Sequence, residues 1–192
     1  MRVLAISGSL RRGSHNTALL RAAEERMPAG VELELWDGLK AVPPYDEDDD
    51  GGGAAAPAAV TALRSAVAGA DAVLIATPEY NHSVPGALKN ALDWVSRPIA
   101  TNPLRNRPVA VIGASTGIFG AVWAQAELRK VLGAIGARVV DRELAVGRAA
   151  ERVGGAVDDR ELLTQLGEVV DELVGAVRER EAAHAAGQPL AA

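Results

Sequence analysis

The first seventeen residues, MRVLAISGSLRRGSHNT, constrain the fold more than any other stretch of the chain. Residues 2–6 form a short apolar run with two β-branched side chains, which is typical of a strand buried on both faces of a parallel sheet. Gly8 ends the run, and the loop after it carries the hydroxyls of Ser9, Ser14 and Thr17. The helix predicted next, TALLRAAEERM, would direct its free N-terminal N–H groups at this loop. The stretch therefore favours the binding of a phosphate.

Two better-known phosphate loops do not match these residues. GSLRRGSH has the two glycines of a P-loop, but Ser14 and His15 stand where the lysine and the magnesium-binding hydroxyl belong, which argues against an ATPase. The dinucleotide pattern G-x-G-x-x-G also fails, because Gly8 has no second glycine at the required spacing. A loop rich in hydroxyls suits a phosphate monoester such as that of FMN. The remaining alternative is a solvated turn that only caps a helix.

Length and cysteine content bound the organisation of the chain. We expect one domain over residues 1–185 and a disordered tail over residues 186–192, because 192 residues can bury a substantial core in one unit. The absence of cysteine excludes disulfides, thiol catalysis and cysteine metal sites, and it agrees with a reducing cytoplasm. The first apolar run is not preceded by the basic segment that is typical of signal peptides, and it is too short to span a membrane. We therefore expect a cytoplasmic protein with no membrane partner.

Charge and histidine placement exclude further classes of function. The formal net charge of −5 gives no support to nucleic acid or to an anionic membrane surface as a partner. Part of the acidic excess is local, in the run DEDDD at residues 46–50, which GGGAAAP follows; such a run is most often a solvated loop. The three histidines, His15, His82 and His184, lie far apart and predict no metal site.

Strand-like and helix-like segments alternate along the whole chain. Further strands are predicted at residues 31–36, 71–77 and 107–113, and a fifth at 138–140, with or without 143–146. Helices are predicted from residue 57, and at 85–95, 121–132 and 159–183. Residues 37–56 are irregular, and their length indicates a functional or a mobile loop. Five such repeats predict an α/β, flavodoxin-like three-layer sandwich, with a five-stranded parallel sheet in the order 2-1-3-4-5. The loops after the first, third and fourth strands would then meet at the carboxyl edge of the sheet.

Residues 78–94, PEYNHSVPGALKNALDW, closely resemble the NADPH-dependent FMN reductase family, which includes chromate- and quinone-reducing flavoproteins. GSLRRGSHNT before this motif and GASTGIFGA after it match the same family, so that the resemblance covers roughly residues 1–175. It implies an FMN phosphate in the first loop, the flavin ring along the second loop and the other ring edge at the third. The residues that this assigns to cofactor binding are Ser9, Arg11, Ser14, Asn16 and Thr17, then Pro78, Glu79, Tyr80 and Asn81, and then Ser115, Thr116 and Gly117.

The chemistry of these residues agrees with what the resemblance implies. A phosphate dianion needs several donors and a helix terminus, which the first loop provides, although Arg11 suits the nicotinamide cofactor equally well. Pro78 fixes the backbone of the second loop, and the amides after it can donate to the ring edge and favour the anionic reduced flavin. No catalytic side chain is required, because FMN carries the chemistry.

The function implied is that of an FMN-dependent oxidoreductase. It would take hydride from NADPH or NADH and pass electrons to a small-molecule acceptor, such as a quinone or free flavin. The alternatives are a flavodoxin-like one-electron carrier and a reductase that supplies reduced FMN to a monooxygenase. The family resemblance also implies a homodimer or homotetramer. We expect its contacts along the apolar side of the helix from Leu88 to Trp94 and at Trp123, and both tryptophans are predicted to be core or subunit contacts.

Overall fold

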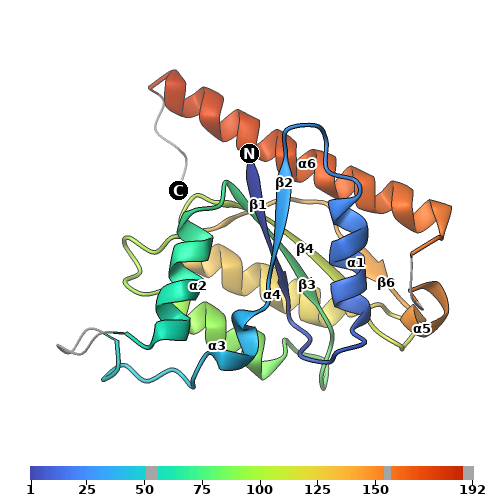
Figure 1. Cartoon of the computed structure of the whole chain (residues 1–192), viewed down its shortest axis with the longest axis horizontal. Helices are drawn as coiled ribbons and strands as arrows, with labels where there is room; N and C mark the ends of the chain where they lie inside the picture. The colour runs from blue at the N-terminus through green and yellow to red at the C-terminus, as the bar shows by residue number, and fades with distance from the viewer. Residues whose placement is uncertain (51–55, 154–156, 188–192) are drawn as a thin grey trace.

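The computed structural model describes residues 1–50, 56–153 and 157–187. Its sheet is parallel and contains β1 (Arg2–Ser7), β2 (Glu32–Trp36), β3 (Ala72–Thr77), β4 (Pro108–Ala114) and β5 (Arg138–Val139) in the order β2-β1-β3-β4-β5. This confirms the predicted fold class and strand order. The strands run downward in Figure 1, and the loops after β1 and β3 lie together at the lower edge of the view.

The strand beyond β4 is split into two pieces. β5 pairs with Pro108 and Val109 at the start of β4, whereas β6 (Leu144–Val146) pairs with residues 112–114 at its end. Both segments that the sequence indicated for this strand thus lie on the same edge of β4. The split places the end of β6 beside the loop that follows β4, at the carboxyl edge of the sheet.

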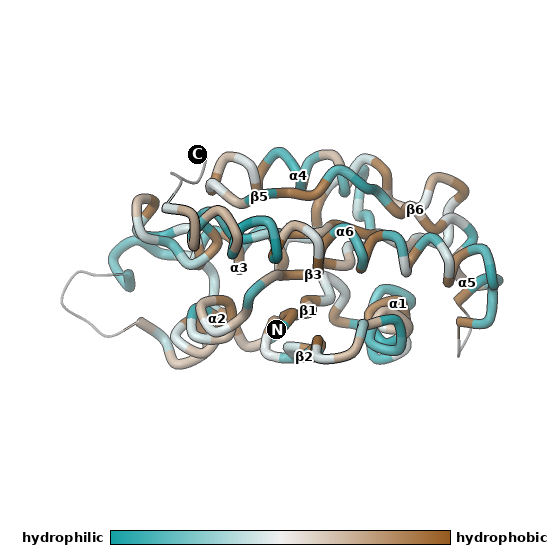
Figure 2. The backbone as a smooth tube through the Cα atoms, turned by 90° about the horizontal axis from the view of Figure 1, so that it is seen from above, coloured by the Kyte–Doolittle hydropathy of each residue, from teal (hydrophilic) through white to brown (hydrophobic). Residues whose placement is uncertain are grey.

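Helices cover both faces of the sheet. α1 (His15–Glu24) and α6 (Arg160–Ala185) pack on one face, and α2 (Ala58–Ala68), α3 (Gly86–Val95) and α4 (Val122–Ile135) pack on the other. Figure 2 shows α1 and α2 on opposite sides of the hydrophobic strands β1 and β3. Alternate strand residues supply the two cores, because successive side chains of a strand point to opposite faces. Val3, Leu74 and Ile112 enter the first core, and Leu4, Ile75 and Val111 enter the second.

Local chemistry sets where the helices begin and end. The Ser14 hydroxyl caps α1 by accepting from the backbone N–H of Thr17 at 3.2 Å. The helix therefore begins at His15, before the Thr17 start that the sequence suggested. Asp159 caps α6 in the same way through the N–H of Leu162. No helix of the described ranges has both the length and the apolar character that a membrane crossing requires.

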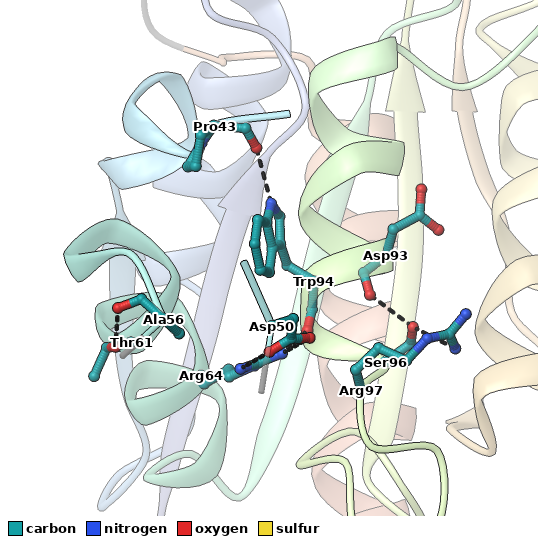
Figure 3. A network of polar contacts seen from close by, with 9 residues as sticks. All are labelled: Pro43, Asp50, Ala56, Thr61, Arg64, Asp93, Trp94, Ser96 and Arg97. Atoms are coloured by element: carbon teal, nitrogen blue, oxygen red, sulfur yellow. Dashed lines mark hydrogen bonds and ion pairs between the residues drawn. The ribbon is translucent and has the colours of Figure 1, made fainter. Parts of the chain in front are cut away.

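The irregular segment after β2 is fastened to the body of the protein, as Figure 3 shows. It contains a short 3-10 helix, η1 (Gly38–Ala41), and the carbonyl of Pro43 then accepts from Trp94 Nε1 at 2.8 Å. Arg64 donates to both carboxylate oxygens of Asp50, at 2.9 and 2.7 Å, and to the carbonyl of Trp94 at 2.6 Å. The side chain of Asp50 is only 10% exposed. The prediction of a solvated acidic run therefore fits residues 46–49, which are exposed, and is wrong for Asp50.

Two further predictions concern Trp94 and the C-terminal tail. Trp94 is completely buried, which confirms it as a core residue. The predicted tail lies mostly outside the described residues, since only positions 186 and 187 of it are described.

Candidate functional site

The loops after β1, β3 and β4 enclose one cleft of about 450 Å³ at the carboxyl edge of the sheet. In an open α/β sheet this edge is where ligands bind. The cleft brings together most of the predicted cofactor-binding residues and adds three from outside that prediction. Its lining residues are Ser9, Arg11, Ser14, His15, Asn16, Pro78, Glu79, Tyr80, Ala114, Ser115, Thr116 and Ala150.

Three predicted residues do not line the cleft, and their contacts explain why. The hydroxyl of Thr17 donates to Ser7 Oγ at 2.9 Å and so turns back toward β1. The carbonyl of Gly117 accepts from the N–H of Arg148 at 2.8 Å. Asn81 occupies the exposed tip of the second loop. These residues contribute to the conformation of the loops and do not line the cleft.

Some residues of the cleft were not indicated by the sequence; one is the neighbour of a predicted site residue, and another lies far along the chain. His15 is the first residue of α1, and its Nδ1 lies 2.9 Å from the carbonyl oxygen of Val153. Ala150 belongs to the short helix α5 (Ala149–Arg152), to which no motif pointed. Among the described residues no group of histidine and carboxylate side chains could hold a metal ion.

The first loop passes very close to the second. The N–H of Gly8 donates to the carbonyl of Ala76 at 2.8 Å, which extends the pairing of β1 with β3 into the loop. A Cβ at this position would lie 2.9 Å from the Leu88 side chain and 3.3 Å from the Pro78 ring. A side chain at this position would require Leu88 and Pro78 to shift, so glycine allows the close approach without rearrangement. The first loop is thereby positioned beside the start of the second.

Asn16 ties α1 to the end of β4. It is buried, with 3% exposure, and its Nδ2 donates to the carbonyl of Ala114 while its Oδ1 accepts from the Ala114 N–H, both at 3.0 Å. The amide thus satisfies both backbone polar groups of the last residue of β4. This is a different set of partners from the phosphate contact predicted for the side chain. Its observed contacts fix the distance between the first and third loops.

The second loop contains a tight turn. Tyr80 and Ser83 exchange two backbone hydrogen bonds, of 3.2 and 3.1 Å, across Asn81 and His82. Both central residues have positive φ, 52° and 59°, as a type I′ turn requires. Asparagine adopts this conformation readily, whereas His82 stands where glycine is preferred. The turn presents Tyr80 at the mouth of the cleft with 53% of the residue exposed.

The carboxylate of Glu79 binds the first turn of α4. Its Oε2 accepts from the N–H groups of Trp123 at 3.0 Å and Ala124 at 3.1 Å, and the side chain is 12% exposed. The residue at the cap position of α4, Ala121, has no polar side chain. Glu79 therefore satisfies N–H groups that the helix leaves unpaired, and its charge is favoured by the helix dipole. No local signal in the sequence indicates this contact.

A second carboxylate makes the reverse connection. Glu127, on α4, accepts from the Ser83 hydroxyl at 2.6 Å and from the N–H of Val84 at 3.3 Å. Two hydrogen bonds lower the pKa of Glu127 below its ordinary value, because both donors stabilise the ionised form. The bond from Ser83 has the larger effect and that from Val84 the smaller. We call this pair of carboxylates, Glu79 and Glu127, the carboxylate clamp. It holds both ends of the second loop against one helix.

The third loop is braced by β6 and α5. The N–H of Ser115 donates to the carbonyl of Val146 at 3.1 Å, and the Ser115 carbonyl accepts from the N–H of Ala149 at 2.9 Å. Gly120 has a φ of 64°, and a Cβ there would lie 2.5 Å from the backbone of Ala145. A residue with a side chain would thus force the loop away from β6. The split strand consequently positions one wall of the cleft.

Large hydrophobic side chains are exposed beside the clamp. We call Ile118, Phe119, Val122 and Trp123 the apolar rim; Phe119 is 55% and Trp123 is 42% exposed. The Trp123 ring packs edge-to-face against the rings of His82 and Phe119, with ring centroids 4.7 and 5.0 Å apart. By contrast, the apolar side of α3 is buried in the core of its own chain. The expectation that α3 offers this side to another subunit is therefore wrong.

The donor set of the cleft fits FMN. The hydroxyls of Ser9 and Ser14, the Arg11 guanidinium and the start of α1 provide the donors that a phosphate dianion requires. Pro78, Ala114 and Tyr80 provide apolar surface for a flat ring, and backbone groups of the second and third loops border it. The distribution of polar and apolar groups thus suits a molecule with one phosphate end and one aromatic end.

Comparison with known proteins supports the same assignment. Residues 1–151 match the family described as NADPH-dependent FMN reductase. An NAD(P)H-dependent FMN reductase of Pseudomonas aeruginosa is 46% identical over 132 residues, which are 69% of each chain. A quinone reductase of Escherichia coli is 37% identical over 172 residues, which cover 90% of this chain and 86% of the relative.

A solved structure is similar over nearly the whole chain. FerB, a flavoenzyme NAD(P)H:(acceptor) oxidoreductase from Paracoccus denitrificans, superposes with a TM-score of 0.81 and 34% identity, covering 93% of this chain and 97% of FerB. These matches confirm the predicted resemblance, the enzyme class of flavin-dependent oxidoreductases and the pairing of FMN with NAD(P)H. The chain belongs to the NADPH-dependent FMN reductase family.

Proposed function

We propose that the protein passes electrons from NADPH or NADH, through FMN, to a quinone, free flavin or a similar small-molecule acceptor. One observation carries this proposal: a single cleft joins phosphate donors at the start of α1 to the exposed turn at Tyr80. The names of the relatives supply the class of acceptor, since one is an FMN reductase and another a quinone reductase.

The proposed phosphate contacts follow from which donors remain available. Ser9, Arg11 and Ser14 line the cleft, and the hydroxyl hydrogen of Ser14 is free to donate, since its oxygen accepts from Thr17. The backbone N–H of Asn16 takes the place of its amide, which Ala114 occupies. Thr17 contributes indirectly, by holding the hydroxyl of Ser7.

The proposed ring contacts come from the second and third loops. Pro78 and the backbone from Glu79 to Asn81 border one edge of the ring, while Ser115, Thr116 and the loop that Gly117 stabilises border the other. Bound FMN supplies the hydride and single-electron chemistry. The second and third loops would hold the ring, and the exposed position of Tyr80 leaves the mouth of the cleft accessible to NAD(P)H and acceptor.

We further propose a homodimer or homotetramer in which the apolar rim is buried between subunits, and a cytoplasmic location as the sequence predicts. Exposed Phe119 and Trp123 next to one another support the interface, because burying apolar surface yields about 25 cal/mol per Å² before the entropy of association is subtracted. Closed symmetric pairing is the commonest arrangement of soluble oligomers. Light scattering of the wild type and of Trp123→Arg tests this: we expect an oligomer for the first and smaller particles for the second.

The experiment that tests the function starts from the purified protein. Its chromophore is released and identified, and the oxidation of NADPH and of NADH is followed with a quinone and with free FMN. We expect bound FMN and steady oxidation with a quinone. A protein that holds FMN but oxidises neither nucleotide would support the electron carrier instead. Turnover with free FMN alone would support a reductase that supplies reduced flavin.

A further inference from the structure

A second, smaller recess of about 220 Å³ lies on the outer side of the first loop and α1. Arg12, Ser14, His15, Arg21 and Val153 are among its lining residues. It shares Ser14 and His15 with the flavin cleft, so the two spaces adjoin. Ser14 and Arg21 are seven positions apart and thus lie on one side of the helix. The recess is therefore built from one helix face, the loop before it and the end of α5.

The charge of this recess is uniformly basic. It is lined by two guanidinium groups and an imidazole, and its lining contains no carboxylate. Within the described ranges, neither Arg12 nor Arg21 has a carboxylate within 4.0 Å, so no ion pair inside the protein neutralises either guanidinium group. His15 is oriented by the carbonyl of Val153, which accepts from Nδ1; Nε2 is left for a ligand and donates to an anion when the imidazole is protonated. Such a set of donors favours a dianion.

The size of the recess restricts what that dianion can belong to. Whole small-molecule sites occupy roughly 300–1,000 Å³. The recess at about 220 Å³ is smaller, so it suits one group of a ligand whose remainder lies in the adjoining cleft. The phosphate of FMN already has its proposed donors in the cleft. NADPH carries one phosphate monoester, the 2′-phosphate of its adenosine ribose, whereas NADH carries none.

We propose that Arg12, Arg21 and His15 form a subsite for the 2′-phosphate of NADPH. The inference rests on the proposed function, since it assigns the recess to the electron donor of that reaction. Binding there would select NADPH over NADH by charge, without any change in the flavin site.

The test measures binding directly, on the protein loaded with FMN. Adenosine 2′,5′-bisphosphate and 5′-AMP are titrated by calorimetry into the wild type, Arg21→Gln and Arg12→Gln. Arg26→Gln is the matched control, because Arg26 is exposed just beyond α1 and lies outside the recess. We expect the wild type to prefer the bisphosphate, and each recess variant to lose roughly tenfold or more of that preference. The control should keep the preference. Equal affinity of the wild type for both nucleotides would overturn the subsite.

Two further measurements separate the possible occupants and failures. Inorganic phosphate is added as a competitor to show whether a free anion fills the recess. If phosphate weakened the binding of the bisphosphate and of 5′-AMP equally, the result would count against the assignment. A loss of FMN affinity in Arg21→Gln would place the flavin phosphate there and overturn it. With a quinone as acceptor, the ratio of the NADPH and NADH KM values should change in the recess variants. An unchanged ratio contradicts the subsite alone, whereas a wild type that oxidises neither nucleotide contradicts the proposed function.

Discussion

The Glu79 carboxylate accepts a 3.0 Å hydrogen bond from the backbone N–H of Trp123, a residue 44 positions later. The contact joins the predicted flavin loop to the first turn of α4. Its partner in the clamp, Glu127, makes the return contact to Ser83. The shape of the second loop therefore depends on a helix that does not line the cleft itself.

Glu79→Ala should lower both stability and FMN affinity. Removing a side-chain cap costs about 0.5–2 kcal/mol of unfolding free energy, and the freed loop would hold the ring less firmly. Urea denaturation of the apoprotein and a fluorescence titration with FMN measure the two effects. Glu47→Ala, an exposed residue of the acidic run, is the control and should change neither. Wild-type affinity in Glu79→Ala would show that the clamp does not shape the site.

Asn16→Ala should destabilise the apoprotein before any flavin is added. It leaves the N–H and carbonyl of Ala114 without their partner, and an unsatisfied buried group costs roughly 1–3 kcal/mol. Denaturant unfolding of apo and FMN-loaded protein would show this loss in both states. If only the loaded protein were destabilised, the amide would act through the phosphate, as the sequence suggested.

The clamp should also leave a signature in the pH dependence of stability. Hydrogen bonds from Ser83 and Val84 lower the pKa of Glu127 in the folded state. Their stabilisation is therefore complete above the ordinary glutamate pKa, about 4.3, and is lost as the pH falls through the lowered value. NMR titration should find a lowered pKa in the wild type and a value closer to the ordinary one in Ser83→Ala. An identical pKa in both proteins would contradict the assigned cause.

Arg64→Ala should release the segment after η1. Arg64 holds Asp50 and the carbonyl of Trp94 together, so its loss frees the acidic run from α3. We expect faster cleavage within residues 42–50 by a protease specific for acidic residues. Arg64→Lys keeps the charge without the paired contact to Asp50 and should be intermediate. Cleavage at the wild-type rate in Arg64→Ala would mean that other contacts hold the segment.

Local patterns accounted for the sheet and for the loops of the cleft. Apolar runs such as residues 72–77 identify buried strands, and the order of alternating elements fixes which loops share an edge. The clamp could not be predicted, because Glu79 and Trp123 meet only after α4 has packed on the sheet. The partners of Asn16 were missed for the same reason: the sequence around an asparagine in the first turn of a helix is the same whether its side chain faces a ligand or a backbone carbonyl. Contacts between distant segments carry no local signal.

The most direct test of the central claim is a titration of the apoprotein with FMN, riboflavin and FAD, followed by flavin fluorescence. The account predicts tight noncovalent binding of FMN. It predicts weaker binding of riboflavin, which lacks the charge-assisted phosphate contacts worth roughly 1.5–3 kcal/mol each. It also predicts weaker binding of FAD, because the donors of the first loop suit a terminal phosphate monoester, which FAD does not carry. Retention of FAD in preference to FMN, or no binding of any flavin, would contradict the account.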